Sequence, residues 1–344
     1  MLAAVKRKIA VIGGGAWGTA LAAHAARIDH EVTLWAREPE VARDVTEKHE
    51  NTLFLDGVAL PPSLRASNDV AAACERAKMV ILVPPSAHLR SVVTTIRGAL
   101  PADAPLVIAT KGIENASLKL MVDVVAEASG RAMEELVVLS GPSFAREVAA
   151  GQPTDVVVAC KNEGSANDIA DALHSPFFRV YTSTDTVGVE LGGALKNVLA
   201  IAAGACDGLG MGTNARAALI TRGLAEMARL GVALGGEPLT FMGLSGMGDL
   251  ILTATGALSR NRSLGMKIAE GMDAKAYLAT QRTVAEGFGT AKAAWELAQK
   301  HGVDVPITEL VYRVLHEGMP LFDALKQLLN RAQKHELWGF KVSK

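Results

Sequence analysis

Short apolar and β-branched runs alternate with longer helical stretches through the first half of the chain. Several runs are apolar at consecutive positions, which is typical of strands buried on both faces. The predicted strands are residues 8–12, 31–35, 79–83, 106–109, 136–139, 155–159 and 178–181. Ala- and Leu-rich segments with helical spacing, such as residues 19–27 and 118–127, lie between them. This alternation predicts an α/β fold in which crossover helices join the parallel strands of a doubly wound sheet.

The pattern changes after about residue 187, where the strand-like runs stop and long helical segments follow. These segments are residues 189–205, 215–234, 285–301 and 307–315, joined by Gly-rich connections. We therefore predict a sheet domain in residues 1–188 and an all-helical domain in residues 189–344. Two domains also agree with a length of 344 residues, given a typical domain of about 150 residues.

The charges of the chain balance, which limits the partners to expect. Lys plus Arg number 35 against 36 Asp plus Glu, so the formal net charge is −1. This balance argues against nucleic acid or an anionic membrane as a partner, although a local basic cluster could still bind one anionic ligand. Apart from the glycine-interrupted stretch that begins at Ile9, no uncharged apolar run reaches the ~18 residues that a membrane span needs, so we expect no membrane insertion.

The N-terminus and the cysteines bear on the compartment. A basic start followed by an uncharged stretch is similar to a secretory signal, but four glycines between residues 13 and 18 would weaken a membrane-seeking helix. Cys74, Cys160 and Cys206 lie far apart and form no CxxC pair. Neither a disulfide framework nor a metal site is expected, and three thiols suit a reducing compartment. We expect a cytoplasmic protein.

The first predicted strand runs directly into Gly13-Gly14-Gly15-Ala16-Trp17-Gly18, which matches the pattern GxGxxG. The first glycine permits a tight turn, the second lets the backbone approach a pyrophosphate, and the third lets helix pack on strand. The motif alone is weak, but here a strand precedes it, and a helix-like segment and a second strand follow. The sequence therefore predicts a dinucleotide site at Gly13, Gly15 and Gly18.

The end of the second predicted strand bears on the choice between NAD and NADP. An acidic residue is usual there in NAD sites, whereas this chain has Arg37. Arginine cannot accept a hydrogen bond from a ribose 2′-hydroxyl, but it can pair with a 2′-phosphate. The position favours NADPH while leaving NAD possible. The alternative is a solvated arginine, because the acidic Glu38 follows immediately.

Polar residues follow two more predicted strands. Lys111 comes after the fourth, and the segment Ser140-Gly141-Pro142-Ser143-Phe144-Ala145 begins as the fifth ends. The carboxyl ends of strands in an open α/β sheet face one crevice, where such folds bind ligands. A lysine at a strand end is often only a solvated charge, but its place beside a dinucleotide site favours a functional role.

Lys196 is the candidate for chemistry in the helical half. It lies among Gly, Ala, Leu and Val residues, where a charge is costly unless it has a partner. Burial of an amine favours proton release, which suits proton transfer to a carbonyl oxygen. The alternative is a lysine that extends its amine into water. Asp249 begins a later apolar segment and is most simply a helix-start residue.

A short basic segment, Ser259-Arg260-Asn261-Arg262, combines hydroxyl, guanidinium and amide groups. That set suits a phosphate, because a guanidinium can bind two of its oxygens at once. Such a segment is usually solvated surface, so both interpretations remain open at this point.

Taken in order, these motifs resemble those of NAD(P)-dependent glycerol-3-phosphate dehydrogenases. Besides GGGAWG they are TKGIE, SGPSFAxE, ALKN, GLSGMGDL, SRNR and VAEG, and they run from residue 13 to 287. The chain departs from the family pattern at Val83-Pro84-Pro85-Ser86, which has an extra proline, and at Ala16, where serine is common. The resemblance implies a Rossmann-type domain followed by an all-helical domain similar to that of 6-phosphogluconate dehydrogenases, with the active site between them.

The resemblance also implies a reaction and residue roles. Dihydroxyacetone phosphate, a small phosphorylated substrate, would be reduced to sn-glycerol 3-phosphate for glycerophospholipid biosynthesis, and a homodimer is expected. Lys196 would transfer the proton, with Asp249 and Lys111 as companions. Further substrate contacts would come from Arg260 and Asn261 as the phosphate clamp, with Ser259, Gly141 and Ser143. The cofactor contacts would be Gly13, Gly15, Ala16, Trp17, Gly18, Arg37, Lys111, Ala145, Arg260, Val284 and Glu286.

Two other functions are compatible with parts of this pattern. A β-hydroxyacid or ketopantoate-type reductase shares the fold outline and a helical-domain lysine, and it would act on a carboxylate rather than a phosphate. A non-enzymatic module that binds NADP and senses redox state would have no use for both a buried lysine and a separate anion clamp. Turnover of dihydroxyacetone phosphate distinguishes all three.

Overall fold

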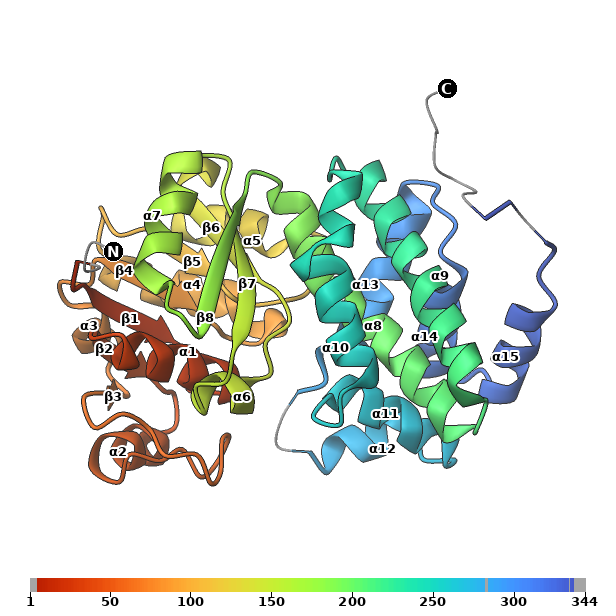
Figure 1. Ribbon diagram of the computed structural model, residues 1–344, viewed down its shortest axis with the longest axis horizontal. Coiled ribbons are helices and arrows are strands. Elements are labelled where there is room, and N and C mark those ends of the chain that lie inside the picture. The colour runs from red at the N-terminus through yellow and green to blue at the C-terminus, as the bar shows by residue number, and fades with distance from the viewer. Residues whose placement is uncertain (1–4, 282–283, 334, 337–344) are drawn as a thin grey trace. The chain divides into compact units, whose positions relative to one another are not determined.

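The computed structural model describes residues 5–281, 284–333 and 335–336. The chain divides into two compact units (Figure 1). The N-terminal unit comprises Met1–Glu114 and Lys119–Glu190, and the C-terminal unit comprises Asn115–Leu118 and Leu191–Lys344. The first unit contains the sheet and the second is helical, so the predicted fold class is confirmed.

The sheet of the N-terminal unit has eight strands in the order β3-β2-β1-β4-β5-β6-β7-β8. Their bounds are β1 Lys8–Ile12, β2 Glu31–Trp35, β3 Arg65–Ser67, β4 Met79–Leu82, β5 Leu106–Ile108, β6 Leu136–Ser140, β7 Thr154–Ala159 and β8 Phe178–Ser183. The seven predicted strands are all present. β3 was not predicted, because it is a three-residue edge strand, Arg65-Ala66-Ser67, without an apolar run.

One strand pairing differs from the prediction that the strands are parallel. All neighbours in the sheet are parallel except β6 and β7, which are antiparallel. The helix between them, α6 (Ala145–Ala149), has only five residues. At ~1.5 Å per residue it spans about half the ~16 Å length of a five-residue strand. The helix is therefore too short to return the chain to the edge of the sheet where β6 begins. As a result, β7 starts at the edge where β6 ends and runs antiparallel to it.

Helices cover both faces of this sheet (Figure 1). The helices of the unit are α1 Ala16–Arg27, α2 Pro39–Glu47, α3 Val70–Cys74, α4 Leu89–Ile96, α5 Met121–Ser129, α6 and α7 Glu163–Leu173. α1, α6 and α7 pack on the face that carries Ile9, Val11 and Ile81. Strand residues that alternate with these, such as Ala10 and Val80, are also fully buried. Burial on both faces explains why the strands read as continuous apolar runs.

The C-terminal unit is built from long helices. They are α8 Thr186–Gly208, whose first turn belongs to the N-terminal unit, α9 Gly212–Ala233, α10 Asp249–Thr255, α11 Arg260–Ala269, α12 Ala274–Ala279, α13 Glu286–Lys300, α14 Pro306–His316 and α15 Leu321–Leu329. Val198, Ile201, Leu264 and Val311 form part of its core. α8 is long and apolar enough to cross a membrane by length and composition alone, but 94% of that stretch is buried inside the protein. Burial of this kind is what a central core helix shows.

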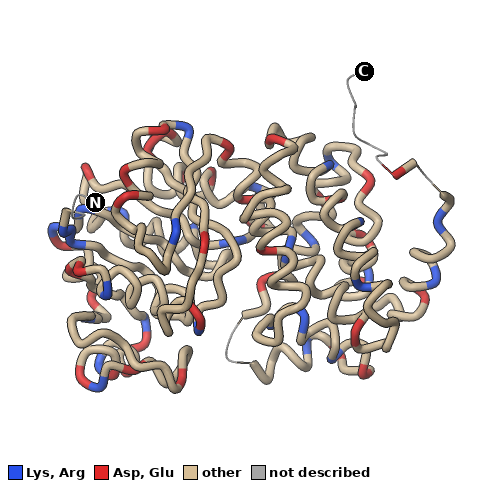
Figure 2. Tube along the Cα trace, in the orientation of Figure 1, with Lys and Arg blue, Asp and Glu red and all other residues tan. Residues whose placement is uncertain are grey.

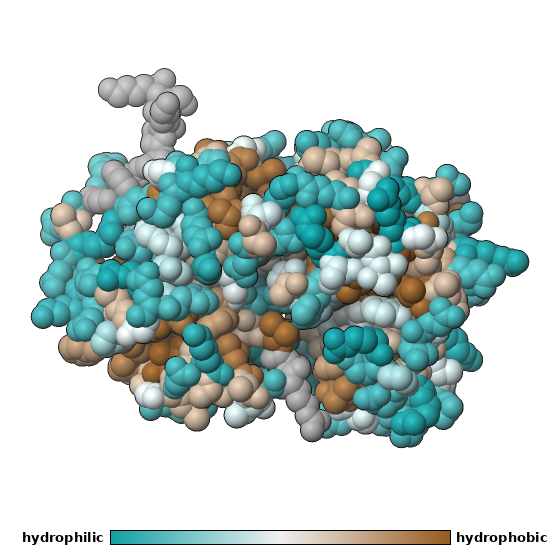
Figure 3. All heavy atoms as spheres, turned by 180° about the vertical axis from the view of Figure 1, so that it is seen from behind, coloured by the Kyte–Doolittle hydropathy of each residue, from teal (hydrophilic) through white to brown (hydrophobic). Residues whose placement is uncertain are grey.

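The surface carries both signs of charge. Figure 2 shows Lys and Arg interspersed with Asp and Glu along both units. The face seen in Figure 3 is mainly hydrophilic and is interrupted by apolar patches. This mixture reflects the balanced composition of the chain.

Candidate active site

The glycine turn after β1 has the shape that a dinucleotide phosphate requires. Gly13 has φ +129°, and a Cβ there would lie 2.9 Å from the carbonyl group of Val83. A Cβ on Gly18 would lie 1.9 Å from the oxygen of Gly13, so close packing needs both glycines. A Cβ on Gly15 would meet nothing within 4 Å. The backbone of Gly15, at the N-terminus of α1, is therefore open to a ligand.

Two side chains support this turn. The Asn51 amide, which is 1% exposed, donates to the oxygen of Gly14 at 2.9 Å and to Oγ1 of Thr19 at 2.8 Å. Sequence analysis missed Asn51, because it lies far along the chain from the turn that it holds. The Trp17 indole nitrogen is buried and has no hydrogen-bond partner among the described residues. A buried N–H without a partner is unusual, and a bound ligand could satisfy it. The turn therefore fits a dinucleotide.

Arg37 lies two residues beyond β2, and its side chain is 80% exposed. Its Nε and Nη2 donate to Oε1 of Glu38 at 3.1 and 2.8 Å. An exposed pair of this kind is worth only ~0–1 kcal/mol. A doubly charged 2′-phosphate can therefore compete with Glu38 for the guanidinium. The pairing with Glu38 is compatible both with binding of a 2′-phosphate and with a solvated arginine.

The structure brings the predicted strand ends of the N-terminal unit together. Lys111, just after β5, donates from Nζ to the oxygen of Gly141 at 3.0 Å, and the Ser143 hydroxyl donates to the same oxygen at 3.0 Å. Thr110 donates to the oxygen of Pro84 at 2.7 Å. The proline-rich departure from the family pattern thus lies at this same edge of the sheet.

The other predicted cofactor residues lie at or just before the starts of helices. Ala16 is the first residue of α1 and Ala145 the first of α6, and both are half-buried against the sheet core. In the C-terminal unit, Val284 is 49% exposed and Glu286 is the first residue of α13.

A buried ion pair forms the centre of the candidate site in the C-terminal unit. Lys196 on α8 donates from Nζ to Oδ1 of Asp249 at 2.5 Å and to Oγ1 of Thr253 at 3.0 Å. Lys196 is 8% exposed and Asp249 is fully buried. Lys196 does not extend its amine into water, as the alternative prediction had it. It is held between two acceptors on α10.

Asp249 does begin α10, as predicted, but the dipole of that helix is not its main partner. The residues before it, Leu244–Gly248, form a π-helical turn. A Cβ on Gly192 of α8 would lie 2.6 Å from the oxygen of Ser245 in this turn. This small residue lets α8 approach closely enough for Lys196 to reach Asp249. Thr253, which sequence analysis missed, lies one helical turn beyond Asp249 and faces the same amine.

The basic segment at residues 259–262 is the start of α11 rather than a loop. Ser259 is its N-cap, and its hydroxyl accepts from the nitrogen of Arg262 at 3.2 Å. The Arg262 guanidinium pairs with Asp207 at 2.8 Å, a partner that the sequence did not reveal. Arg260 is the first residue of the helix and is exposed. A guanidinium at a helix N-terminus, where backbone N–H groups also point outward, suits an anion.

The Asn261 side chain is held by hydrogen bonds within the C-terminal unit. Its Nδ2 donates to Oδ1 of Asn197 at 2.8 Å, and its Oδ1 accepts from the nitrogen of Gly287 at 3.0 Å. Asn261 is 7% exposed. These bonds join α8, α11 and α13 within the C-terminal unit. Asn197, next to Lys196, was part of a quoted motif but had no predicted role.

Within the described residues, no cluster of three or more His, Cys, Asp or Glu side chains could hold a metal ion. Cys74, Cys160 and Cys206 are all buried, free thiols. The groups that the structure does bring together are a buried amine with its carboxylate partner, a guanidinium at a helix N-terminus and a glycine turn, which suit proton transfer, anion binding and dinucleotide binding.

Comparisons with known proteins agree with this chemistry. Residues 8–166 match the family described as NAD-dependent glycerol-3-phosphate dehydrogenase N-terminus, and residues 185–326 match its C-terminus. The chain is 50% identical over 330 residues to glycerol-3-phosphate dehydrogenase [NAD(P)+] from Geobacter sp. (strain M21), covering 96% of this chain and 98% of the relative.

Solved structures extend the comparison. The crystal structure of glycerol-3-phosphate dehydrogenase from Coxiella burnetii matches with a TM-score of 0.90 and 40% identity, covering 95% of this chain and 99% of that chain. A ketopantoate reductase from Ralstonia eutropha matches with a TM-score of 0.60 and 17% identity, covering 93% of this chain and 99% of that chain, which shows a shared fold alone. With both halves matched and half of its residues identical to those of a full-length relative, the chain belongs to the NAD-dependent glycerol-3-phosphate dehydrogenase family.

Proposed function

We propose that the protein reversibly reduces dihydroxyacetone phosphate to sn-glycerol 3-phosphate, with NADPH favoured over NADH. The observation that carries this proposal is the buried amine of Lys196, held by Asp249 and Thr253, in the unit whose helix α11 begins with Arg260. A proton donor and an anion site in one rigid helical unit suit a phosphorylated ketone. Membership of the dehydrogenase family supports the same reaction.

The N-terminal unit is proposed to bind the dinucleotide. The open backbone of Gly15, the start of α1 and the Trp17 indole N–H suit the pyrophosphate region, and Arg37 suits a 2′-phosphate. When bound, the nicotinamide supplies the hydride. The remaining proposed contacts are Gly13, Ala16, Gly18, Lys111, Ala145, Arg260, Val284 and Glu286.

Lys196 is proposed to donate a proton from Nζ to the carbonyl oxygen of the substrate as that oxygen gains negative charge. In the reverse direction the neutral amine removes the proton from the hydroxyl group. Asp249 and Thr253 orient the amine, and the fully buried carboxylate keeps the site overall neutral. A charge held in a dry site stabilises a developing oxyanion more than the same charge in water does.

The substrate phosphate is proposed to bind at the N-terminus of α11. Arg260 offers a planar fork of donors, and the helix N-terminus adds backbone N–H groups. The Ser259 hydroxyl accepts from the nitrogen of Arg262, so its own hydrogen can be donated to the phosphate. Asn261, fixed in place by its bonds to Asn197 and Gly287, is proposed to complete the clamp with Arg260. From the N-terminal unit, we propose contributions by Lys111, Gly141 and Ser143.

The cellular setting follows from this chemistry. The product is the backbone of glycerophospholipids, so the enzyme supplies their biosynthesis. Three buried free thiols support a reducing, cytoplasmic location. We also propose a homodimer and expect neither nucleic acid nor membrane as a partner.

Initial rates test the proposal. NADPH and NADH are each supplied with dihydroxyacetone phosphate, with ketopantoate and with a panel of 2-keto acids, and NADP+ and NAD+ are each supplied with a panel of 3-hydroxy acids. We expect turnover of dihydroxyacetone phosphate, faster at low cofactor concentration with NADPH. Faster turnover of a carboxylate substrate would instead establish the ketopantoate-type reductase. Tight NADPH binding without turnover of any compound would support the sensing module.

A further inference from the structure

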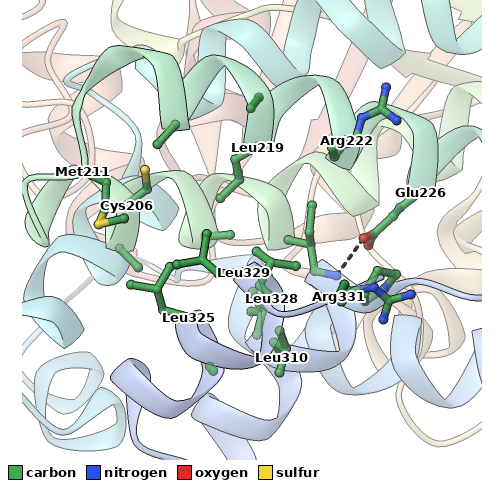
Figure 4. Close-up of a pocket in the computed structure, with 18 of the residues that line it drawn as sticks. Cys206, Met211, Leu219, Arg222, Glu226, Leu310, Leu325, Leu328, Leu329 and Arg331 are labelled. Carbon is green, nitrogen blue, oxygen red and sulfur yellow. Dashed lines mark hydrogen bonds between the residues drawn. The ribbon is translucent and has the colours of Figure 1, made fainter. Parts of the chain in front are cut away.

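The C-terminal unit contains a cavity lined by α8, α9, α14, α15 and described residues between 331 and 336 (Figure 4). Its volume is about 490 Å³. That size lies within the ~300–1,000 Å³ of small-molecule sites. Lys196, Asp249 and Arg260 are not among the described residues that line it, so it is distinct from the candidate active site.

The cavity has an apolar end and a charged end. In Figure 4, Cys206 and Met211 lie at one end, and Arg222, Glu226 and Arg331 lie at the other. The wall between them is aliphatic and includes Leu219, Leu310, Leu325 and Leu328. Among the described residues that line the cavity, none is Phe, Tyr or Trp. An aliphatic chain would contact methyl and methylene groups along this wall.

The charged end offers Arg222 to an anion. Its Nη1 donates to the backbone oxygen of Glu336 at 3.1 Å, and its Nη2 lies 3.7 Å from the Glu336 carboxylate, whose side chain is 80% exposed. An exposed pair at that distance contributes little, so a ligand carboxylate can displace it. Arg331, by comparison, is paired with Asp304 at 2.7 Å.

The structure shows no hydrogen bond between the described side chains of Glu226 and Arg222. Its two carboxylate oxygens accept from the nitrogens of Ile307 and Thr308 at 2.7 and 3.1 Å, at the start of α14. Burial raises the pKa of Glu226 to about 7, so the carboxyl carries less than a full negative charge at neutral pH. Its repulsion of a bound anion is correspondingly reduced.

α15 would gain contacts from such a ligand. Of the α15 residues that line the cavity, Ala324 is buried, whereas Leu329 is 68% exposed. An aliphatic chain lying between α15 and α9 would bury the leucines of α15 that face the cavity. Each buried methylene of the ligand is worth ~0.8 kcal/mol.

We propose that this cavity binds a single unbranched aliphatic chain that ends in a carboxylate, with the carboxylate at Arg222 and the chain directed toward Met211. The site adds a binding function to the proposed enzyme and does not depend on turnover. Its ligand is a free fatty carboxylate of medium or long chain.

The test is calorimetric titration of the full chain with dodecanoate below its micellar concentration. Dodecyltrimethylammonium serves as a probe with the same chain and the opposite charge. Arg222→Gln removes the head contact and Ala218→Trp fills the chain region, while Arg43→Gln on α2 is the matched control, an exposed arginine outside the cavity. Circular dichroism and sedimentation velocity check the fold and the assembly of each variant.

We expect saturable binding of one dodecanoate per chain and none of dodecyltrimethylammonium. Arg222→Gln should weaken binding at least tenfold, Ala218→Trp should abolish it, and Arg43→Gln should leave it unchanged. Equal binding of both probes, or no saturable binding, would overturn the proposal. So would a parent dimer that Ala218→Trp converts to monomers, because the cavity would then be an interface between copies. If Ala218→Trp does not fold, the ratio of Arg222→Gln to Arg43→Gln affinities decides.

Discussion

The buried pair of Lys196 and Asp249 allows the chemical role of the amine to be separated from its structural role. Lys196→Met removes the amine and keeps the apolar stem, but it leaves the fully buried carboxylate of Asp249 without its cation. Removing one partner of a buried pair typically costs ~3–5 kcal/mol of stability. The single variant therefore confounds loss of catalysis with loss of folding.

The double variant Lys196→Met/Asp249→Asn resolves this. With both charges removed, replacement of a buried pair by neutral groups of similar volume is often close to neutral for stability. The amide introduced at position 249 keeps an oxygen near Thr253, which accepts or donates through its hydroxyl. Most of the free energy of unfolding lost in Lys196→Met should therefore return in the double variant. The rate should not return, because loss of general acid catalysis alone costs ~10²–10⁴-fold.

The assay pairs denaturant unfolding with single-turnover oxidation of NADPH by dihydroxyacetone phosphate. Cofactor affinity is measured on the same samples, since Lys196 lies outside the unit that is proposed to bind the dinucleotide phosphates. A double variant that is stable, binds NADPH and reacts at least a hundredfold more slowly supports the role of Lys196. A chemical step within tenfold of the parent would refute it, and Lys111 would become the leading candidate.

Three further changes test other parts of the structure. Arg37→Asp should lose ~1.5–3 kcal/mol of NADPH affinity, the scale of a charge-assisted hydrogen bond, with a smaller loss for NADH; equal losses in equilibrium binding would contradict the assignment. Arg260→Lys keeps the positive charge but loses the planar pair of N–H donors that can bind two phosphate oxygens, so the KM for dihydroxyacetone phosphate should rise. An unchanged KM would show that the substrate phosphate binds elsewhere. Because the pKa of Glu226 is raised to about 7 in the folded protein, the folded state holds a proton that the unfolded state releases above its ordinary value of 4.5. The parent should therefore lose stability relative to Glu226→Gln as the pH rises from 5 to 8, by up to about 3 kcal/mol, and parallel profiles in denaturant titrations would refute this.

Much of the N-terminal unit could be predicted because its signals are local. A buried parallel strand is a continuous apolar run, so β1 and β2 could be predicted from the sequence. The turn at Gly13 could be predicted as well, because all the glycines that it requires lie within the six residues of GxGxxG. The antiparallel β7 could not, because strand direction depends on whether the short α6 spans the sheet. β3 had no signal, since an edge strand of three residues is defined by its pairing with β2.

The candidate site shows the same limit. Lys196 was predicted because a cation in an apolar helix is costly, which is a property of its immediate neighbours. Its partners Asp249 and Thr253 lie more than fifty residues away, and their role follows from helix packing that sequence spacing does not encode. The role of Arg262 could not be predicted for the same reason. Only the fold shows that Asp207 holds Arg262 while Arg260 remains exposed.

Close packing of backbones explains why this helical unit can serve as a rigid site. A Cβ on Gly204 of α8 would lie 1.9 Å from the oxygen of Arg262, and one on Gly265 of α11 would lie 2.0 Å from the oxygen of Ile201. The two helices therefore touch backbone to backbone, and the amides of Asn197 and Asn261 can bond directly across them. Each amide is adjacent in sequence to a proposed functional residue, Lys196 or Arg260. The backbones that carry Lys196 and Arg260, the proposed proton donor and phosphate clamp, are thus fixed by close contact between α8 and α11. A fixed arrangement of this kind favours reaction by positioning the substrate before the chemical step.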